Sequence, residues 1–315
     1  MDRSDLTAFL RDRGVDSAGV EVLPGGEKNQ NWLVRSAGDR RFVVRRYSTS
    51  TAAEVEYELH ATAFLSRQGF PTPAPVRTLD GSFWTLLDDR PAALFTFAEG
   101  EHPAGLTDDG YVSPDLGLGR QAAALAGRIH ALSAGQAFPG RRAAHRDPLS
   151  RIRRFLDSPY AGLPVLGEAV ARLHAQLDKM TAVYADPRGL RQGLVHNDIS
   201  AVNLLLDPST GEISALLDFD DCITSFQLYD LGRIAETWGR DSDRHANLDR
   251  IRALVEAYHL ARPLTDRERE LAVDLIATYA AATGVDVLTN MLRNGGEVSS
   301  PYDSHSMLFF LDLCL

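Results

Sequence analysis

Three polar side chains follow an apolar run in the stretch LVHNDISAVNLLLD, residues 194–207. His196 and Asp198 are two residues apart, and Asn203 comes five residues after Asp198. This spacing can place Asp198 and Asn203 on opposite sides of one tight loop, where the carboxylate accepts a hydroxyl proton and the amide oxygen binds a hard cation. His196 is expected to brace the loop. The stretch therefore indicates a catalytic loop that combines a general base with a metal ligand.

A second apolar run, LLDFDD at residues 216–221, ends in carboxylates. The segments 203–206 and 213–218 flank the turn residues DPSTGE, so they predict a β-hairpin. This hairpin would carry Asp218 back beside Asn203, so that both could share one Mg²⁺ ion. A few hard oxygen ligands, completed by water and phosphate, suit Mg²⁺ better than zinc.

Each of these residues also has an ordinary structural interpretation. Asn203 and Asp207 are common turn formers, and the carboxylates of DFDD can be a solvated helix cap. The complete ordered set is more specific than any single member. His-x-Asp-x-x-x-x-Asn, followed by Asp-Phe-Asp after a second strand, favours phosphoryl transfer.

The elements that must position these motifs begin with a β-rich segment. Residues 19–48 alternate β-forming runs with strong turn residues, which predicts an antiparallel sheet. Helices are expected at 3–13 and 52–68, and two further strands at 83–87 and 92–98.

From residue 117 onward helical periodicity dominates the chain. The expected helices are 117–133, 149–157, 166–185, 226–239, 246–260, 266–280 and 284–293. We therefore predict an α+β, bilobal fold. A small antiparallel N-lobe, residues 1–98, would cover a nucleotide, and a larger helical C-lobe, residues 99–315, would hold the catalytic loop and the acceptor site.

Composition limits the classes of function. The chain has 315 residues with 44% hydrophobic composition, enough for a sizeable core, and a net charge of -10 that argues against nucleic acid as a partner. No apolar run approaches the roughly 20 residues that span a bilayer, so no membrane partner is expected. The charged N-terminal segment does not resemble a signal peptide. With only two cysteines, Cys222 and Cys314, we expect a reducing cytoplasm.

HNDISAVN and LLDFDD resemble the catalytic and metal motifs of the aminoglycoside phosphotransferase and choline kinase superfamily, relatives of the protein kinases. Five other segments resemble the family's landmarks in the same order: LPGGEKNQNWLV, RFVVRRY, GFPTPAPV, AALFTFAEGEH and AALAGRIHALS. The resemblance covers nearly the whole chain and is nearest the homoserine kinase and hydroxylysine kinase branch. It implies a protein-kinase-like fold and ATP- and Mg²⁺-dependent phosphorylation of a small-molecule hydroxyl.

The resemblance also implies roles for matching positions. Asp198 would be the catalytic base, and Asn203 and Asp218 would hold Mg²⁺. Asp220 would be a second metal ligand or a supporting residue, or else a surface carboxylate. Asp230, in YDLG, would buttress the catalytic loop, although an N-cap role alone would explain it equally well.

The segment PGGEKNQN lies where the family covers the ATP phosphates. Gly25 and Gly26 permit close backbone approach, while Lys28, Asn29 and Asn31 can donate to phosphate oxygens. The segment lacks the G-x-G-x-x-G pattern of protein kinases. An ordinary hairpin turn would also explain the two glycines.

Arg45, in FVVRR, stands where protein kinases place the lysine that pairs with the ATP phosphates and a helix glutamate. Arginine keeps the charge but has a different geometry. Its partner is expected to be Glu58, with Glu54 as the runner-up and Glu56 left open. The departure at Arg45 suggests a rival function, a catalytically silent nucleotide-binding module.

The strand in AALFTFAEG is expected to cross between the lobes. Backbone groups around Phe95, Thr96 and Phe97 would bind the adenine edge while apolar side chains enclose the ring. The phenylalanines can equally be plain core. His130 is expected to be a core histidine rather than a ligand.

Two charged clusters leave the identity of the acceptor open. Six arginines could bind the carboxylate of a hydroxy-amino acid such as homoserine: Arg141, Arg142, Arg146, Arg151, Arg153 and Arg154. Five carboxylates would instead suit a polycationic aminoglycoside: Glu99, Glu101, Asp108, Asp109 and Asp115. Either cluster can be merely solvated. A metal-dependent hydrolase is a third, weaker interpretation, and we expect a monomer or homodimer.

Overall fold

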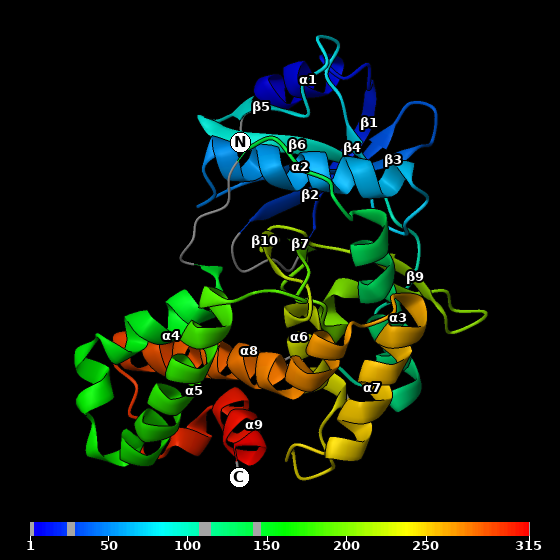
Figure 1. Cartoon of the computed structure of the whole chain (residues 1–315). Helices are drawn as coiled ribbons and strands as arrows, with labels where there is room; N and C mark the ends of the chain where they lie inside the picture. The colour runs from blue at the N-terminus through cyan, green and yellow to red at the C-terminus, as the bar shows by residue number, and fades with distance from the viewer. Residues whose placement is uncertain (1–2, 24–28, 107–114, 141–145, 315) are drawn as a thin grey trace.

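The computed structural model describes residues 3–23, 29–106, 115–140 and 146–314, and it has two lobes (Figure 1). In the N-lobe, antiparallel strands are ordered β1-β2-β3-β6-β4, with β5 also paired to β6. The strands are β1 Ser17–Leu23, β2 Gln30–Ser36, β3 Arg41–Arg46, β4 Pro75–Val76, β5 Trp84–Leu87 and β6 Arg90–Thr96. Helix α1, Arg3–Arg11, packs Leu6 and Leu10 against one face of this sheet.

Alternation along β3 directs its side chains to both faces of the sheet. Phe42 and Val44 are buried in the cluster under α1, whereas Val43 and Arg45 line a cavity on the other face. The sequence of this strand therefore serves a core and a site at once.

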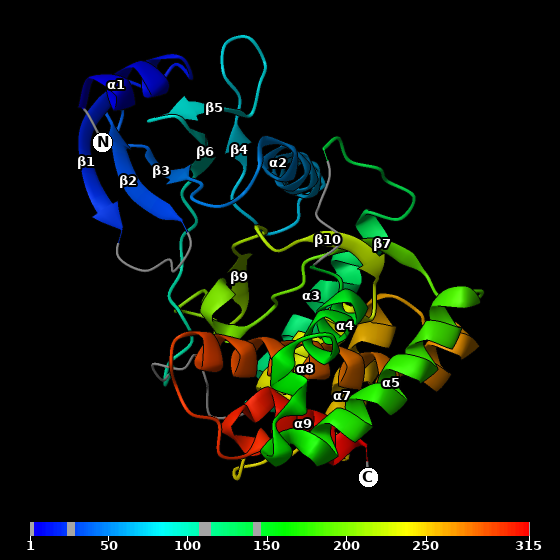
Figure 2. The same cartoon turned by 90° about the vertical axis from the view of Figure 1, so that its left-hand side faces the viewer.

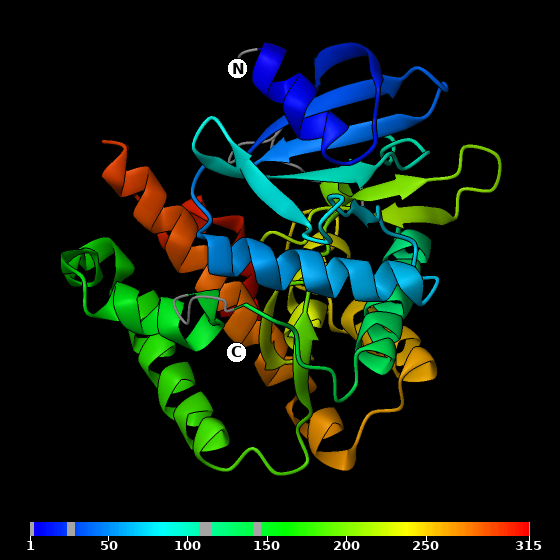
Figure 3. The same ribbon diagram turned by 90° about the horizontal axis from the view of Figure 1, so that it is seen from above.

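Helix α2, Ala52–Arg67, lies between the lobes, beside the sheet and above β10 (Figures 2 and 3). It begins with a capping box formed by Thr51 and Glu54. Its Leu59 is buried in an N-lobe cluster, whereas Leu65 is buried in the C-lobe core. The helix is apolar on two sides because each side packs on a different lobe.

The C-lobe is mainly helical. Its helices are α3 Leu116–Leu132, α4 Pro148–Leu156, α5 Gly167–Ala185, α6 Tyr229–Trp238, α7 Leu248–Ala261, α8 Asp266–Arg293 and α9 His305–Leu313. Short 3₁₀ helices occur at Pro159–Gly162, Pro164–Leu166, Ala201–Asn203 and Pro301–Asp303. Two small antiparallel pairs carry the motifs: β7 Gln192–Val195 with β10 Ile223–Phe226, and β8 Leu204–Leu206 with β9 Ile213–Leu216.

The predicted α+β bilobal class is confirmed, and so is the hairpin at 203–218. The expected break between helices 266–280 and 284–293 is wrong, because α8 runs without interruption through Gly284. A Cβ at Gly284 would lie 2.8 Å from the backbone nitrogen of Met307, so the glycine permits close packing of α9. Helix α9 and strand β10 were not predicted. The lobe boundary expected at residues 98 and 99 stays a prediction.

Helix α8 is long and apolar enough, by length and composition, to cross a membrane. However, 72% of its apolar window is buried inside the molecule. No other helix among the described residues meets the same criterion. Burial in the C-lobe core therefore accounts for its composition.

Candidate active site

The catalytic loop connects β7 to β8 and contains both Asp198 and Asn203. The side-chain nitrogen of Asn203 donates to the backbone oxygen of Asp198 at 2.9 Å and to its Oδ2 at 2.8 Å. An amide that donates through its nitrogen keeps its oxygen available for a cation. The structure thus brings the expected base and the expected metal ligand into direct contact.

His196 holds the catalytic loop in place through both of its ring nitrogens. Its Nδ1 accepts a hydrogen bond from the backbone N–H of Asp198 at 3.2 Å, and its Nε2 lies 3.0 Å from the backbone oxygen of Leu217. Because Nδ1 is an acceptor, Nε2 carries the proton and donates to Leu217. The neutral imidazole therefore connects the catalytic loop to the strand that leads to Asp218.

Asp230 holds the loop from the first turn of α6. Its carboxylate accepts hydrogen bonds from the backbone N–H groups of His196 at 3.0 Å and Asn197 at 2.7 Å. The N-cap alternative is not supported, because α6 has no side-chain cap hydrogen bond. His130 completes the network, 3.0 Å from Asp230 and 2.7 Å from the hydroxyl of Tyr258. Burial lowers the pKa of His130, which is a core histidine, as expected.

The hairpin β8–β9 returns Asp218 to the loop. The backbone N–H of Leu217 donates to the oxygen of Asn203 at 2.8 Å, so Asp218 follows directly beside Asn203. Asp218 has a left-handed backbone, φ 62°, which is unfavourable for a non-glycine residue and often marks a functional site. Asp220 is only 7% exposed and accepts from Asn29 Nδ2 at 3.1 Å, so the surface-carboxylate alternative is wrong.

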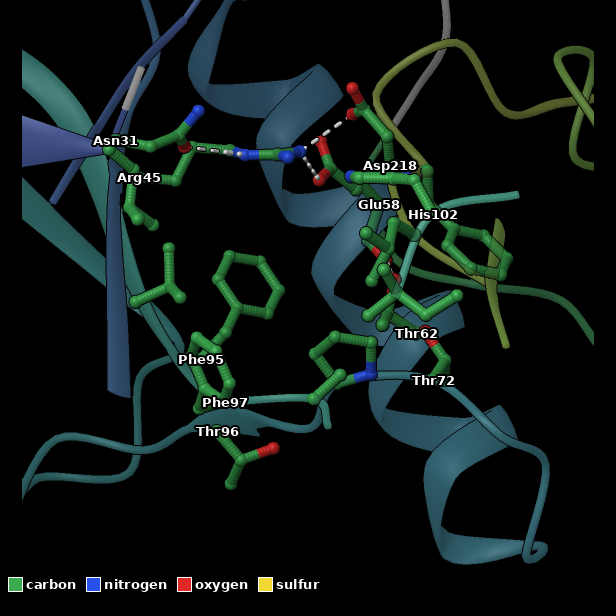
Figure 4. Close-up of a pocket in the computed structure, with 17 residues that line it drawn as sticks. Asn31, Arg45, Glu58, Thr62, Thr72, Phe95, Thr96, Phe97, His102 and Asp218 are labelled. Atoms are coloured by element: carbon green, nitrogen blue, oxygen red, sulfur yellow. Dashed lines mark hydrogen bonds and ion pairs between the residues drawn. The ribbon is translucent and has the colours of Figure 1, made fainter. Parts of the chain in front are cut away.

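Arg45 lies at the centre of an ion-pair network between the lobes (Figure 4). Its Nη1 lies 2.7 Å from Asp218 Oδ1 and 3.5 Å from Glu58 Oε1, and its Nε donates to Asn31 Oδ1 at 3.3 Å. Burial alone would raise the pKa of Asp218, but the Arg45 guanidinium outweighs burial and holds that pKa below its usual value. The carboxylate is therefore ionised and ready for a cation.

The structure also separates the three candidate glutamates on α2. Glu54 forms the capping box with Thr51, and Glu56 contacts His60 at 2.8 Å. Only Glu58, which is 1% exposed, lies within ion-pair distance of Arg45.

A cavity of about 300 Å³ opens beside Arg45 (Figure 4). Apolar residues from both lobes line it: Leu23 and Val43 from the N-lobe, and Leu205, Leu217 and Phe219 from the C-lobe. The expected residues Asn31, Phe95, Thr96 and Phe97 also line it. Gly25, Gly26 and Lys28 lie outside the described residues. The shape and lining suit a flat aromatic ring with a charged group at the Arg45 end.

The expected contact of adenine with the backbone around Phe95, Thr96 and Phe97 stays a prediction, but two of its N–H groups cannot supply it. The backbone N–H groups of Thr96 and Phe97 are not available to adenine, because they donate to Ala74 at 2.9 Å and Arg41 at 3.2 Å. Strand β6 has paired neighbours on both edges. Ala98 lies just beyond the strand and lines the cavity, so the chain after β6 is the better candidate for contact with the adenine edge.

Sequence analysis missed Arg233. Its Nε donates to Asp198 Oδ1 at 2.8 Å. Burial lowers the pKa of this guanidinium, but Asp198 more than compensates and raises the pKa overall. The signal was present, because Arg233 follows Asp230 by three residues and so shares its helix face. His102, which lines the cavity, was also missed.

Several described members of the two charged clusters are engaged in ion pairs or in capping. Arg146 contacts Asp221 and Glu54, while Arg151 contacts Asp286 at 2.7 Å. Among the carboxylates, Glu99 pairs with Arg41, and Asp115 caps α3. Arg141, Arg142, Asp108 and Asp109 lie outside the described residues.

The site offers few ligands for a metal ion, and these ligands are hard oxygen atoms. The described part of the chain contains no group of three or more His, Cys, Asp or Glu side chains that could enclose a metal ion. Asn203 and Asp218 together offer an amide oxygen and a carboxylate. Such a partial set fits Mg²⁺ whose remaining ligands are water and phosphate.

Comparison with known proteins agrees with this geometry. Residues 19–264 match the model of the phosphotransferase enzyme family. The chain belongs to this family. It is 31% identical over 288 residues to a homoserine kinase of Gluconacetobacter diazotrophicus, with 89% of this chain and 80% of the relative covered. It is 29% identical over 282 residues to a homoserine kinase of Rhodopseudomonas palustris, with 88% and 81% covered.

Solved structures share the fold. An amicoumacin kinase in complex with AMP-PNP and Ca²⁺ has a TM-score of 0.69 at 14% identity, covering 100% of this chain and 93% of its own. A microcompartment-associated aminopropanol kinase has a TM-score of 0.66 at 21% identity, covering 99% and 94%. The chain is thus a kinase that phosphorylates a hydroxyl group, and the prediction of its family and branch is confirmed.

Proposed function

We propose that this phosphotransferase uses ATP and Mg²⁺ to phosphorylate homoserine or a closely related hydroxy-amino acid. One observation carries the proposal: Asp198, Asn203, Asp218 and Arg45 are linked by direct contacts and short backbone connections beside a cavity of about 300 Å³. Curated relatives that are 28% to 31% identical over most of the chain are homoserine kinases.

The nucleotide would lie in the cavity with its ring between Val43 and Leu217 and its phosphates toward Arg45 and Asn31. Asn203 and Asp218 would hold Mg²⁺, which when bound neutralises the charge that develops on the transferred phosphoryl group. Arg45 would contact phosphate through a guanidinium already fixed by Glu58. These residues therefore position the phosphates before any chemistry occurs.

Asp198 would accept the proton of the acceptor hydroxyl. The hydroxyl oxygen then bonds to the γ-phosphorus, while the bond from that phosphorus to the bridging oxygen breaks and ADP leaves with the electron pair. Asn203 and Arg233 hold the Asp198 carboxylate at 2.8 Å each, so its orientation is fixed before the acceptor binds.

A coupled assay of ADP release over four acceptor classes tests the proposal: hydroxy-amino acids, aminoglycosides, amino alcohols and free sugars. We expect turnover with homoserine and a phosphate monoester product visible by phosphorus NMR. Turnover with aminoglycosides alone would contradict the proposed acceptor. Nucleotide binding without turnover on any acceptor would favour the silent module instead. A cytoplasmic location and a monomeric or homodimeric state stay predictions.

A further inference from the structure

Glu236 is a buried carboxylate that the catalytic scheme above does not use. The residue is 3% exposed, and neither of its side-chain oxygens accepts a hydrogen bond from any described residue. Arg233 forms an ion pair with it, with 3.9 Å between Nη1 and Oε2. A buried carboxylate without hydrogen bonds is unfavourable, so a ligand that supplies a donor to Glu236 would stabilise this residue.

Glu236 belongs to the same face of α6 as the residues that hold the catalytic loop. Asp230, Arg233 and Glu236 recur at intervals of three residues, so they form one row along the helix. Asp230 binds the loop backbone and Arg233 binds Asp198. Along this row, Asp230 contacts the catalytic loop, Arg233 contacts the expected base, and Glu236 follows three residues later.

Tyr279 of α8 supports this placement. Its hydroxyl donates to the backbone oxygen of Asn197 at 2.5 Å, so it touches the catalytic loop. Burial is the main cause of its raised pKa, and the negative charges of Asp198 and Glu236 contribute to it. Both carboxylates therefore favour the protonated form of this phenol, an effect that the guanidinium of Arg233 opposes.

The local charges do not balance. Asp198 and Glu236 are two carboxylates, and the guanidinium of Arg233 lies between them. The next arginine that acts on Tyr279 is Arg151, which is already bonded to Asp286 at 2.7 Å. These two carboxylates therefore share one guanidinium among the described residues, and Arg233 lies closer to Asp198, at 2.8 Å, than to Glu236, at 3.9 Å.

Buried polar atoms without a hydrogen-bond partner occur on both the catalytic loop and α6. Eight buried side-chain atoms of the described residues lack a hydrogen-bond partner, and four of them belong to Asn197, Ser200 and Glu236. Three of those four are carboxylate or amide oxygens, which only accept. An ammonium group offers three donors and a positive charge, which complements the two oxygens of Glu236.

We propose that Glu236 binds the cationic amino group of the acceptor and thereby restricts the enzyme to alcohols that carry an ammonium group. The inference rests on the proposed function, in which the acceptor hydroxyl meets Asp198. It adds a specificity-determining residue, with the acceptor held at its nitrogen by α6 and at its hydroxyl by the catalytic loop.

Three acceptors of matched length test the inference: homoserine, 3-aminopropan-1-ol, which lacks the carboxylate, and 4-hydroxybutyrate, which lacks the ammonium. We expect the wild type to prefer both ammonium-bearing acceptors. Glu236→Gln should raise their KM by about 10- to 100-fold, as expected for loss of a charged hydrogen bond, and leave the KM for 4-hydroxybutyrate unchanged within about threefold. Glu236→Asp keeps the charge and should retain part of the preference.

Glu256→Gln, at an exposed position on α7, is the matched control and should change no KM. The shift in melting temperature on adding ADP verifies that each variant is folded. A Glu236→Gln enzyme that keeps the preference for ammonium, or loses activity equally on all three acceptors, would overturn the inference.

The proposed function can fail separately. Turnover of 3-aminopropan-1-ol but not homoserine would contradict homoserine as the substrate and still support the role of Glu236. Should the wild type use none of the three, the acceptor found in the wider screen decides the matter. If that acceptor carries no cationic nitrogen, the inference is overturned. If it carries one, Glu236→Gln should raise the KM for it.

Discussion

Arg45 shows how a single departure from the protein-kinase pattern is accommodated. A guanidinium reaches three partners at once, Asn31, Glu58 and Asp218, which a single ammonium at the same point could not do with the same geometry. The arginine is thus the residue that ties the sheet, α2 and the metal-binding hairpin together.

Removing this guanidinium should destabilise the protein. In Arg45→Met, the carboxylate of Glu58 stays buried without its cation, and we expect a loss of about 3 kcal/mol in the free energy of unfolding. Urea denaturation measures the loss. Arg45→Met/Glu58→Gln, which removes the stranded charge, should recover most of it. If Arg45→Met were as stable as the wild type, the ion pair between Arg45 and Glu58 would not stabilise the fold.

At this scale, spacing and residue type predicted much of the site. Asp198, Asn203 and Asp218 come together because a short hairpin joins them, and such local geometry follows from turn chemistry. Arg233 escaped notice because its role depends on which face of α6 turns toward the loop. The engagement of the Thr96 and Phe97 N–H groups in other hydrogen bonds was not predicted, because strand pairing is a tertiary property that a single sequence does not reveal.

Among the elements, helix α8 anchors neighbouring segments of the chain through side chains of its first turn. Glu268 closes a capping box with Thr265 and also binds Arg191 and Arg262. Burial would raise the pKa of Glu268, but Arg191, the Thr265 backbone and Arg262 together lower it to about 2.

The lowered pKa predicts how stability depends on pH. A carboxylate with a depressed pKa contributes stability above its unfolded value, near 4.5, and loses that contribution as pH falls toward about 2. Glu268→Gln should therefore be less stable than the wild type at pH 7, by up to about 3 kcal/mol at about 1.4 kcal/mol per pKa unit. The difference, measured by urea unfolding across pH, should shrink between pH 4.5 and 2. A difference that stayed constant with pH would exclude the ion pairs as its cause.

Element boundaries were predicted less well than element types. Strand β10 is only four residues long, Ile223–Phe226, and is stabilised by pairing with β7. The segment is too short to show the alternation of apolar and polar residues that predicts a strand. Two helices, 266–280 and 284–293, were expected where α8 is continuous, because the packing of α9 against Gly284 is a tertiary contact that the sequence does not show.

The whole molecule consists of two lobes whose cores share helix α2. Besides Leu65, α2 contributes Tyr57, whose hydroxyl lies 2.7 Å from Thr224 Oγ1 of the C-lobe. Arg146 of the C-lobe contacts Glu54 on the same helix. Because α2 completes the cores of both lobes, we expect the lobes to unfold together.

Tryptophan fluorescence can check this coupling. Trp32 is buried in the N-lobe and Trp238 in the C-lobe, so variants that lack Trp84 and retain only one of these two report on each lobe separately. Their urea transitions should coincide. Leu65→Ala should cost about 2–5 kcal/mol and shift both transitions by the same amount. A shift confined to Trp238 would show that the lobes unfold independently.

The most direct test of the account is the turnover of Asp198→Asn. The substitution keeps the shape of the side chain and removes the base, so we predict a fall in kcat of about 10²- to 10⁴-fold. In Asp198→Asn, the affinity for a non-hydrolysable ATP analogue should stay nearly unchanged. Asp218→Ala should instead lower both kcat and this affinity. Asp178→Asn, on the exposed side of α5, is the matched control. Turnover near the wild-type rate in Asp198→Asn would contradict the assignment of the catalytic base.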